Sequence, residues 1–174
     1  MNYCSHCGAK VDFRVPQGDD RPRFVCDACH TVHYQNPRMV VGCIPESDGK
    51  VLLCRRSIEP RYGLWTIPAG YLENGETVPE AARREAEEEA YAKVEILALY
   101  SLVDLPRIHQ VYLIFRSRLL DHNYTAGAES LEVRLFSEQE IPWESLAFTS
   151  IRKTLRFYFS DRPGGVFPLH VTRL

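Results

Sequence analysis

Three glutamates near the middle of the chain are spaced to bind a metal ion. In the stretch REAEEEA, at about 100° per helical residue, Glu85, Glu88 and Glu89 fall on one face, whereas Glu87 points nearly the opposite way, toward solvent. Like charges at neighbouring helical positions lower helix stability. Three carboxylates on one face therefore indicate that a cation binds there. Carboxylate oxygens suit Mg²⁺ or Mn²⁺. A solvated acidic helix face is the alternative interpretation.

The chain before these glutamates predicts the helix that carries them. Thr77-Val-Pro-Glu80 is a capping box with proline in the first turn. We therefore expect a helix that starts near Val78 and runs to about Ala90. A glycine-punctuated loop, RYGLWTIPAGYLENGE, leads into it.

A second set of residues has the spacing of a zinc site. Two CxxC pairs, with 18 residues between them, can supply four thiolates: Cys4, Cys7, Cys26 and Cys29. Four protein ligands leave no position for water, so the zinc should be structural. Two unrelated thiol pairs are the alternative. Three nearby histidines are expected to be bystanders rather than ligands: His6, His30 and His33.

The composition of the chain argues against some classes of protein. The 174 residues carry a net charge of −2, which argues against a nucleic-acid binder with a large basic surface. No apolar run is long enough to span a bilayer. No secretory signal precedes Cys4, which favours the cytoplasm. In such a compartment cysteines serve as ligands or buried thiols, and we expect Cys43 and Cys54 in the core of apolar strands.

The elements around these residues predict two domains. Residues 1–36 form the zinc ribbon and have too little apolar material to fold without the ion. Residues 37–174 have the pattern of an α+β domain, a mixed sheet with helices. Its expected elements are a hairpin over 39–44 and 50–56, strands over 94–105, 109–120 and 131–136, a helix over 148–160 and an edge strand in the tail 164–174.

A longer pattern, Gly-x5-Glu-x7-Arg-Glu-x-x-Glu-Glu, resembles the signature of the Nudix hydrolases. The residues that meet it are Gly70, Glu76, Arg84, Glu85, Glu88 and Glu89. The resemblance implies a Nudix fold behind a zinc ribbon and metal-dependent hydrolysis of a diphosphate linkage. It also implies roles for single residues. The three helix glutamates and the main-chain carbonyl of Ala69 would be metal ligands, Arg84 would orient the glutamates, and Gly70 and Glu76 would support the motif.

Two further features concern a glutamate outside the motif and the residue at the motif's last position. The family often supplies one further glutamate from outside it, and here we favour Glu129 over Glu132 as metal ligand or base. Glu132 is equally well explained as a surface strand residue. The family's motif ends with a glycine, whereas this chain has Tyr91. Because that glycine normally ends the helix in a left-handed conformation, we expect a helix that ends differently or runs slightly longer.

Segments outside the motif indicate which kind of Nudix enzyme the chain resembles. NADH diphosphatases also carry a zinc ribbon, and Tyr34 could contact substrate as their tyrosine does, but their Ser-Gln-Pro-Trp-Pro-Phe-Pro stretch is absent. YQNPRMVVGC, ESLEVRLF and SLAFTSI resemble instead the plant chloroplast Nudix enzymes that cleave FAD and ADP-ribose.

The resemblance therefore predicts hydrolysis of a small nucleoside diphosphate derivative. FAD would give FMN and AMP, and ADP-ribose would give AMP and ribose 5-phosphate. Tyr34, Tyr71 and Phe148 are candidates for stacking on a base, with core packing as the alternative for each. Two other functions stay open: an NADH or NAD-capped RNA diphosphatase, and a zinc-ribbon nucleic-acid-binding module with a vestigial hydrolase domain. Related diphosphatases are often homodimers, so a homodimer is one expected form.

Overall fold

The computed structural model describes residues 1–174, which divide into two compact units, Met1–Pro37 and Arg38–Leu174. The N-terminal unit is a small antiparallel sheet of three strands: β1 (Asp12–Arg14), β2 (Arg23–Val25) and β3 (Val32–His33). Its buried apolar side chains are few, Pro16, Val25 and two cysteines, so this unit has almost no hydrophobic core of its own.

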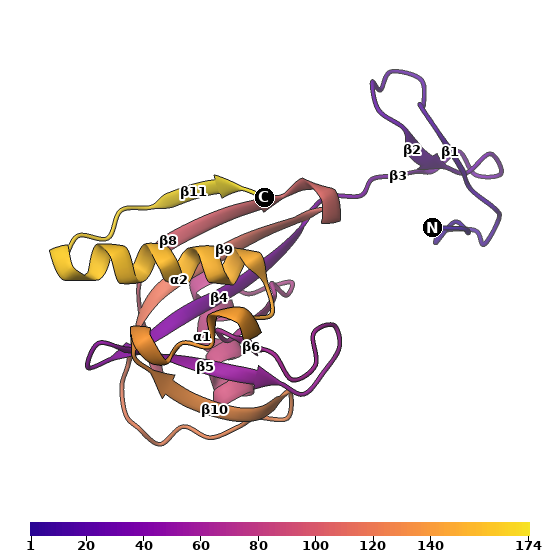
Figure 1. Cartoon of the computed structure of the whole chain (residues 1–174). Coiled ribbons are helices and arrows are strands. Elements are labelled where there is room, and N and C mark those ends of the chain that lie inside the picture. Colours follow the sequence, from indigo (N-terminus) through magenta and orange to yellow (C-terminus); the bar gives the residue numbers. More distant parts are fainter. The chain divides into compact units, whose positions relative to one another are not determined.

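The C-terminal unit is built on one mixed sheet (Figure 1). The strands lie in the order β10-β5-β4-β9-β8-β11, with β6 paired to β5 and β7 paired to β4. β4 and β9 run parallel, as do β11 and β8, and the remaining pairs are antiparallel. The strands are β4 (Arg38–Ser47), β5 (Lys50–Arg56), β6 (Trp65–Thr66), β7 (Ala69–Tyr71), β8 (Val94–Leu105), β9 (Gln110–Leu119), β10 (Ser130–Phe136) and β11 (His170–Arg173).

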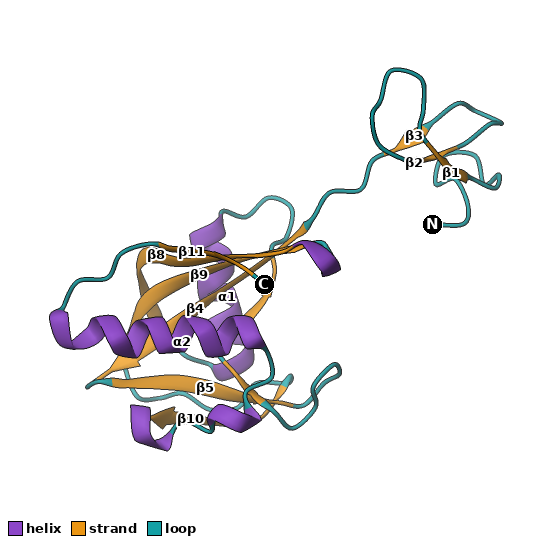
Figure 2. Ribbon diagram, turned by 45° about the horizontal axis from the view of Figure 1, so that its top comes forward, coloured by secondary structure: helices purple, strands orange, loops and turns teal.

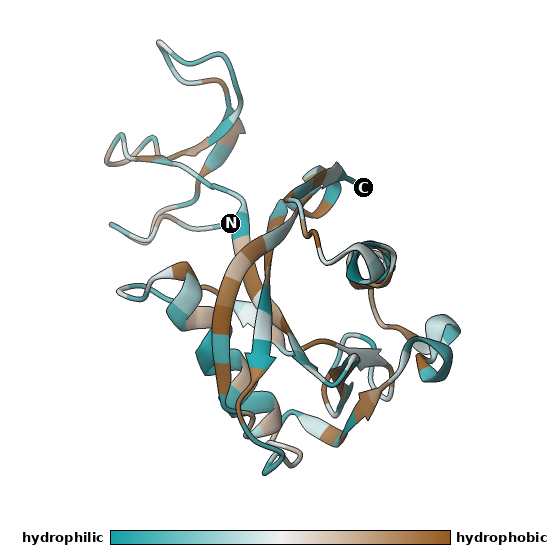
Figure 3. Ribbon diagram, turned by 90° about the vertical axis from the view of Figure 1, so that its left-hand side faces the viewer, coloured by the Kyte–Doolittle hydropathy of each residue, from teal (hydrophilic) through white to brown (hydrophobic).

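Two long helices cover opposite faces of this sheet, α1 (Val78–Ala90) and α2 (Thr149–Asp161) (Figure 2). Alternation along the strands decides which residues face which helix. On β5, Val51 and Leu53 pack with the α2 side, whereas Leu52 and Cys54 pack with the alanines of α1. Both faces are therefore buried, which explains the continuous apolar runs that appear brown in the strands of Figure 3.

Short 3₁₀ helices occupy several connections, at Pro106–Ile108, Glu138–Glu140, Trp143–Ser145 and Arg162–Gly164. The structure contains no helix with the length and apolar character needed to cross a membrane.

The elements expected from the sequence are confirmed. The hairpin, both long strands, the strand over 130–136, the second helix and the tail strand are all present, and α1 has the predicted limits. Cys43 and Cys54 are buried in the core, as expected.

The last residue of α1 is the expected one, but the prediction that the helix would end differently from the family's pattern or run slightly longer is wrong. The helix stops at Ala90, and Tyr91 itself adopts the left-handed conformation, with φ 46° and ψ 30°. The main-chain N–H groups of Tyr91 and Ala92 close the helix end by donating to the carbonyls of Glu87 and Ala86, at 2.8 and 3.1 Å. A tyrosine thus takes the conformation that glycine usually supplies, although its β-carbon disfavours it.

Candidate active site and zinc centre

The four paired cysteines of the N-terminal unit converge on one point. Their sulfurs all lie within 4.8 Å of one another, with Cys4 and Cys29 at 3.7 Å and Cys7 and Cys26 at 3.5 Å. A tetrahedral zinc ion with Zn–S bonds of about 2.3 Å requires sulfur separations of about 3.8 Å. The cluster therefore fits a four-coordinate zinc with no open position.

Two other side chains in this unit contact the cysteine sulfurs but are not needed as zinc ligands, because the four cysteines already fill the four positions. Nε2 of His33 lies 3.3 Å from Sγ of Cys4, and Oγ1 of Thr31 lies 3.1 Å from Sγ of Cys29. Hydrogen bonds of this kind orient ligands and adjust the charge on the sulfurs.

In the C-terminal unit, Arg84 ties α1 to the loop that precedes it. Its guanidinium binds both carboxylate oxygens of Glu76, at 2.8 and 3.0 Å, and donates to the carbonyl of Tyr71 at 3.1 Å. Its Nη1 contacts Glu85 at 2.7 Å and Glu88 at 3.0 Å. With every nitrogen engaged by the protein, Arg84 positions the glutamates and is not a free phosphate ligand.

The Glu76 carboxylate belongs to the same arrangement. Hydrogen bonds from Arg84 and from the main-chain N–H of Glu73 lower the pKa of Glu76 to about 2. It therefore stays ionised and keeps the loop fixed to the helix.

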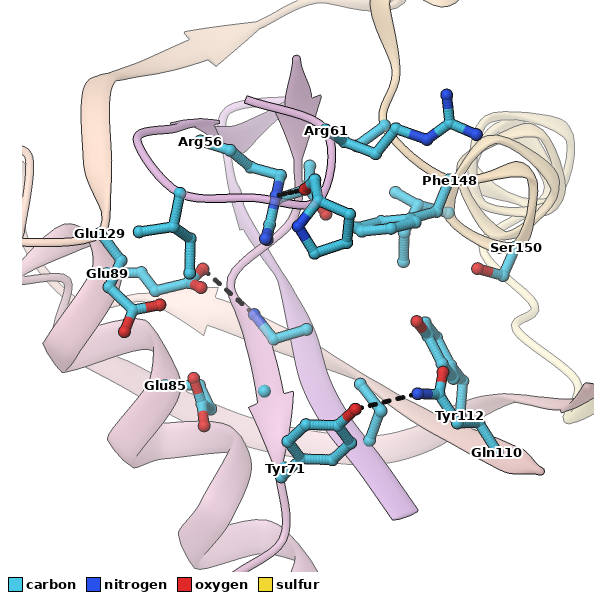
Figure 4. Close-up of a pocket in the computed structure, with 18 of the residues that line it drawn as sticks. Arg56, Arg61, Tyr71, Glu85, Glu89, Gln110, Tyr112, Glu129, Phe148 and Ser150 are labelled. Carbon is cyan, nitrogen blue, oxygen red and sulfur yellow. Dashed lines mark hydrogen bonds between the residues drawn. The ribbon is translucent and has the colours of Figure 1, made fainter. Parts of the chain in front are cut away.

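Glu85 and Glu89 are both buried, and only Glu85 is paired with an arginine, Arg84. Burial is the main cause that raises the pKa of Glu89 to about 8, and the charges of Glu85 and Glu129 add to it. Burial also raises the pKa of Glu85. Glu89 accepts one main-chain hydrogen bond, from Ala69 at 3.3 Å (Figure 4). Desolvated carboxylates that repel one another form a site where a cation would be stabilising.

Gly70 lets strand β7 pass close to this cluster. A β-carbon at this position would lie 2.3 Å from a carboxylate oxygen of Glu85. A larger residue would displace the Glu85 side chain.

Glu129 reaches the cluster from a loop that is bonded along the end of α1. The N–H groups of Thr125 and Gly127 donate to the carbonyls of Ala90 and Glu89, at 2.9 and 3.0 Å. On the other side, Ser57 donates to the carbonyls of Glu129 and Ala128. Glu129 therefore faces Glu89 in Figure 4. By contrast, Glu132 lies on β10, 3.9 Å from Arg55, and does not line the cavity.

These glutamates line one part of a cavity of about 1190 Å³. All their donor atoms are hard oxygens, which fits Mg²⁺ or Mn²⁺. They are spread more widely than the cysteine sulfurs, which form the one group of metal-binding side chains within 4.8 Å of one another. Glu88 is 60% exposed at its side chain and bonded to Arg84, whereas Glu85 and Glu89 are buried.

Two of the three predicted stacking residues line this cavity, Tyr71 and Phe148. The Tyr71 hydroxyl accepts a hydrogen bond from Gln110 at 3.0 Å, and Phe148 lies beneath the guanidinium of Arg56, 5.4 Å from its ring centre. Tyr34 belongs to the N-terminal unit, where its exposed ring lies 5.1 Å from the Arg23 guanidinium. Its role in substrate binding stays a prediction.

Several residues that line the cavity were not predicted from the sequence: Arg56, Arg61, Gln110, Tyr112 and Ser150. The one usable signal was the alternation that places Gln110 and Tyr112 on the same face of a strand. Nothing in the local sequence indicated that this strand end would meet the start of α2.

Comparison with known families covers nearly the whole chain. A model of the NUDIX domain matches residues 36–157, and a model described as Nudix N-terminal, a zinc ribbon, matches residues 2–35. The crystal structure of a NUDIX hydrolase from Nitrosomonas europaea has a TM-score of 0.97 and 52% identity, covering 100% of this chain and 99% of that one.

Curated relatives differ in how much of their length is shared. The ADP-ribose pyrophosphatase of Methanocaldococcus jannaschii is 36% identical over 119 residues, 66% of this chain and 69% of the relative. The NAD-capped RNA hydrolase NudC of Photorhabdus laumondii is 30% identical over 115 residues, 65% of this chain but only 42% of that protein. Family models, fold and relatives agree with the resemblance seen in the motif. The chain therefore belongs to the Nudix hydrolases, as a member with an N-terminal zinc ribbon.

Proposed function

We propose that the protein is a metal-dependent diphosphatase that cleaves the central linkage of a dinucleotide-like substrate, ADP-ribose or FAD. The observation that carries the proposal is the group of carboxylates, Glu85, Glu89 and Glu129, on the wall of a cavity large enough for such a molecule. Hydrolysis of ADP-ribose would release AMP and ribose 5-phosphate, and hydrolysis of FAD would release FMN and AMP.

The glutamates of α1, together with Glu129 and the main-chain carbonyl of Ala69, would hold Mg²⁺ or Mn²⁺. When bound, such an ion neutralises phosphate charge and lowers the pKa of an attacking water. The chain's own residues then have separate tasks. Arg84 fixes the orientation of Glu85 and Glu88, and Glu76 anchors Arg84. Glu129 acts as a further ligand or as the base that accepts a proton from water at its carboxylate.

Support for the substrate class comes from the cavity and from relatives. Tyr71 and Phe148 offer aromatic surface for a base on the cavity wall. The relative from Methanocaldococcus jannaschii is described as an ADP-ribose pyrophosphatase, which favours ADP-ribose. The proposal that FAD is a substrate rests on the resemblance of YQNPRMVVGC and ESLEVRLF to segments of the chloroplast enzymes.

A second candidate is hydrolysis of NADH or of NAD-capped RNA. The similarity to NudC proteins favours it. The Trp-Pro-Phe-Pro stretch expected of NADH diphosphatases is absent, and this region reads LYSLVDLPRIHQVYLIF.

Chromatography of products from ADP-ribose, FAD and NADH, each with Mg²⁺ or Mn²⁺, tests both candidates. Wild-type protein should release AMP, and Glu89→Gln should lower turnover by about 10²-fold or more while the fold persists. Glu144→Gln, at a side chain 90% exposed outside the cavity, is the matched control and should keep full activity. A wild-type rate in Glu89→Gln would refute the metal site, and failure of folded protein to cleave any of the three would refute the substrate class.

A further inference from the structure

The start of helix α2 presents unsatisfied hydrogen-bond donors to the cavity. Phe148 occupies the position before the helix, where a side chain that accepts hydrogen bonds is usual, and the first turn contains no acidic residue. The first main-chain bond of the helix runs from Arg152 to Phe148, at 3.0 Å. The N–H groups of residues 149–151 therefore have no partner within the helix, and all three residues line the cavity.

Two hydroxyl groups in the same cavity also lack partners. Ser150 is 3% exposed and Tyr112 is 7% exposed, and the structure contains no hydrogen bond from either hydroxyl to another protein group. In Figure 4 both oxygens point into the cavity. Burial raises the pKa of Tyr112, so its hydroxyl stays protonated and can donate. Both side chains are buried while their hydroxyls face the cavity, so each hydroxyl is free to donate a hydrogen bond to a ligand there.

Positive charge also lines this cavity, from Arg56 and Arg61. Arg56 stacks on Phe148 and its Nε donates to the carbonyl of Pro60 at 2.9 Å, which fixes the loop that carries Arg61. Neither Arg56 nor Arg61 forms an ion pair with a protein carboxylate, although both line the cavity. The cavity thus has carboxylates at one end, with Arg56 close enough to Glu89 for its charge to act on that carboxyl, and hydrogen-bond donors at the start of α2.

We propose that these donors form a phosphate-binding subsite distinct from the glutamates. This α2 subsite consists of the N–H groups of residues 149–151, the hydroxyls of Ser150 and Tyr112, and the guanidinium of Arg61. The main-chain N–H groups and the guanidinium can only donate hydrogen bonds. They therefore match an anion, which only accepts, better than a base or a sugar, which presents donors as well as acceptors. The subsite would bind a phosphate group of the substrate, and this deepens the function proposed above.

Binding of inorganic phosphate tests the subsite without catalysis. The zinc-loaded protein, with no Mg²⁺ or Mn²⁺ added, would be titrated while amide signals are followed by NMR. Without a divalent ion the glutamates repel phosphate, so the amides of residues 149–151 should shift. Ser150→Ala and Tyr112→Phe each remove only a hydroxyl and should weaken binding about tenfold. Ser145→Ala and Tyr62→Phe, outside the cavity lining, are matched controls, and Glu89→Gln should still bind phosphate.

Kinetics then identify which phosphate is bound. NADH and NADPH differ by one phosphate monoester. An equal rise in KM for both in Ser150→Ala would assign the subsite to the diphosphate, and a rise confined to NADPH would assign it to an additional monoester. No phosphate-induced shift at residues 149–151, or equal phosphate affinity in both hydroxyl variants and wild type, would overturn the subsite. Because the binding arm needs no turnover, its failure is distinguishable from failure of the proposed function.

Discussion

At the scale of single residues, Glu129 and Glu132 have the same side chain and different surroundings. Glu129 lines the cavity and its charge raises the pKa of Glu89, whereas Glu132 lies on β10 beside Arg55. Glu129→Gln should therefore lower kcat by about 10²-fold or more, because it would remove the proposed metal ligand or base. Glu132→Gln is the control and should keep kcat within about twofold, since an exposed ion pair contributes little. Steady-state kinetics with ADP-ribose measure both, and a larger loss in Glu132→Gln would reverse the assignment.

The bond between Glu76 and Arg84 predicts a dependence of stability on pH. The pKa of Glu76 falls from its ordinary 4.5 to about 2 on folding, chiefly through hydrogen bonds from Arg84. Its stabilising contribution is therefore fully present above about pH 4.5 and is lost as pH falls toward 2. Urea unfolding should show Glu76→Gln less stable than wild type at pH 7, with a smaller difference at pH 3. An equal difference at both pH values would show that ionisation of Glu76 contributes nothing.

At the scale of elements, the loop that carries Glu129 depends on a close approach to α1. A β-carbon on Gly127 would lie 1.8 Å from the main-chain carbonyl oxygen of Glu88, so the loop cannot keep its place with any larger residue. Gly127→Ala should destabilise the protein by about 1–3 kcal/mol and lower activity by displacing Glu129. Gly164→Ala, where a β-carbon meets nothing within 4 Å, is the matched control. Wild-type stability and activity in Gly127→Ala, by urea unfolding and kinetics, would show that the loop does not need this contact.

The end of α1 offers a stabilising substitution. Tyr91 is half exposed and adopts φ 46°, a conformation that costs a residue with a β-carbon about 1 kcal/mol. Tyr91→Gly should raise the free energy of unfolding by about 0.5–1 kcal/mol, measured by urea unfolding. Glu87→Gly, at an exposed interior position of the same helix, should lower it by about 1 kcal/mol. Equal losses in the two variants would mean that packing of the Tyr91 ring outweighs its backbone strain.

The same elements show how far sequence reasoning reaches. The start of α1 follows from its capping box, and strands such as β5 follow from apolar runs, because these signals act over a few neighbouring residues. The placement of Tyr112 and Ser150 on the same cavity depends on which strand lies beside β4 and on where α2 begins. The local sequence carries no signal for such long-range pairing. The conformation of Tyr91 was mispredicted because closure of the helix end by main-chain bonds outweighed the preference for glycine.

At the scale of the whole molecule, the two units are stabilised in different ways. Both hydrophobic clusters of the C-terminal unit are built only from residues after Pro37, on the two faces of the sheet. The N-terminal unit has a three-stranded sheet, little buried apolar surface and four convergent cysteines. We therefore expect its folding free energy to come mainly from metal binding, as it does in small zinc domains.

This difference predicts that loss of one ligand unfolds one unit and spares the other. Cys26→Ser should lower the zinc content measured by elemental analysis and make residues 1–37 sensitive to protease, while the C-terminal unit keeps a cooperative thermal transition. Cys54→Ala is the matched control, because it removes a buried thiol from the C-terminal core without touching a ligand. It should lower the melting temperature of the C-terminal unit and leave the zinc content unchanged. Full zinc content in Cys26→Ser would exclude Cys26 as a ligand. Loss of both units together would show that folding of the catalytic unit requires the ribbon.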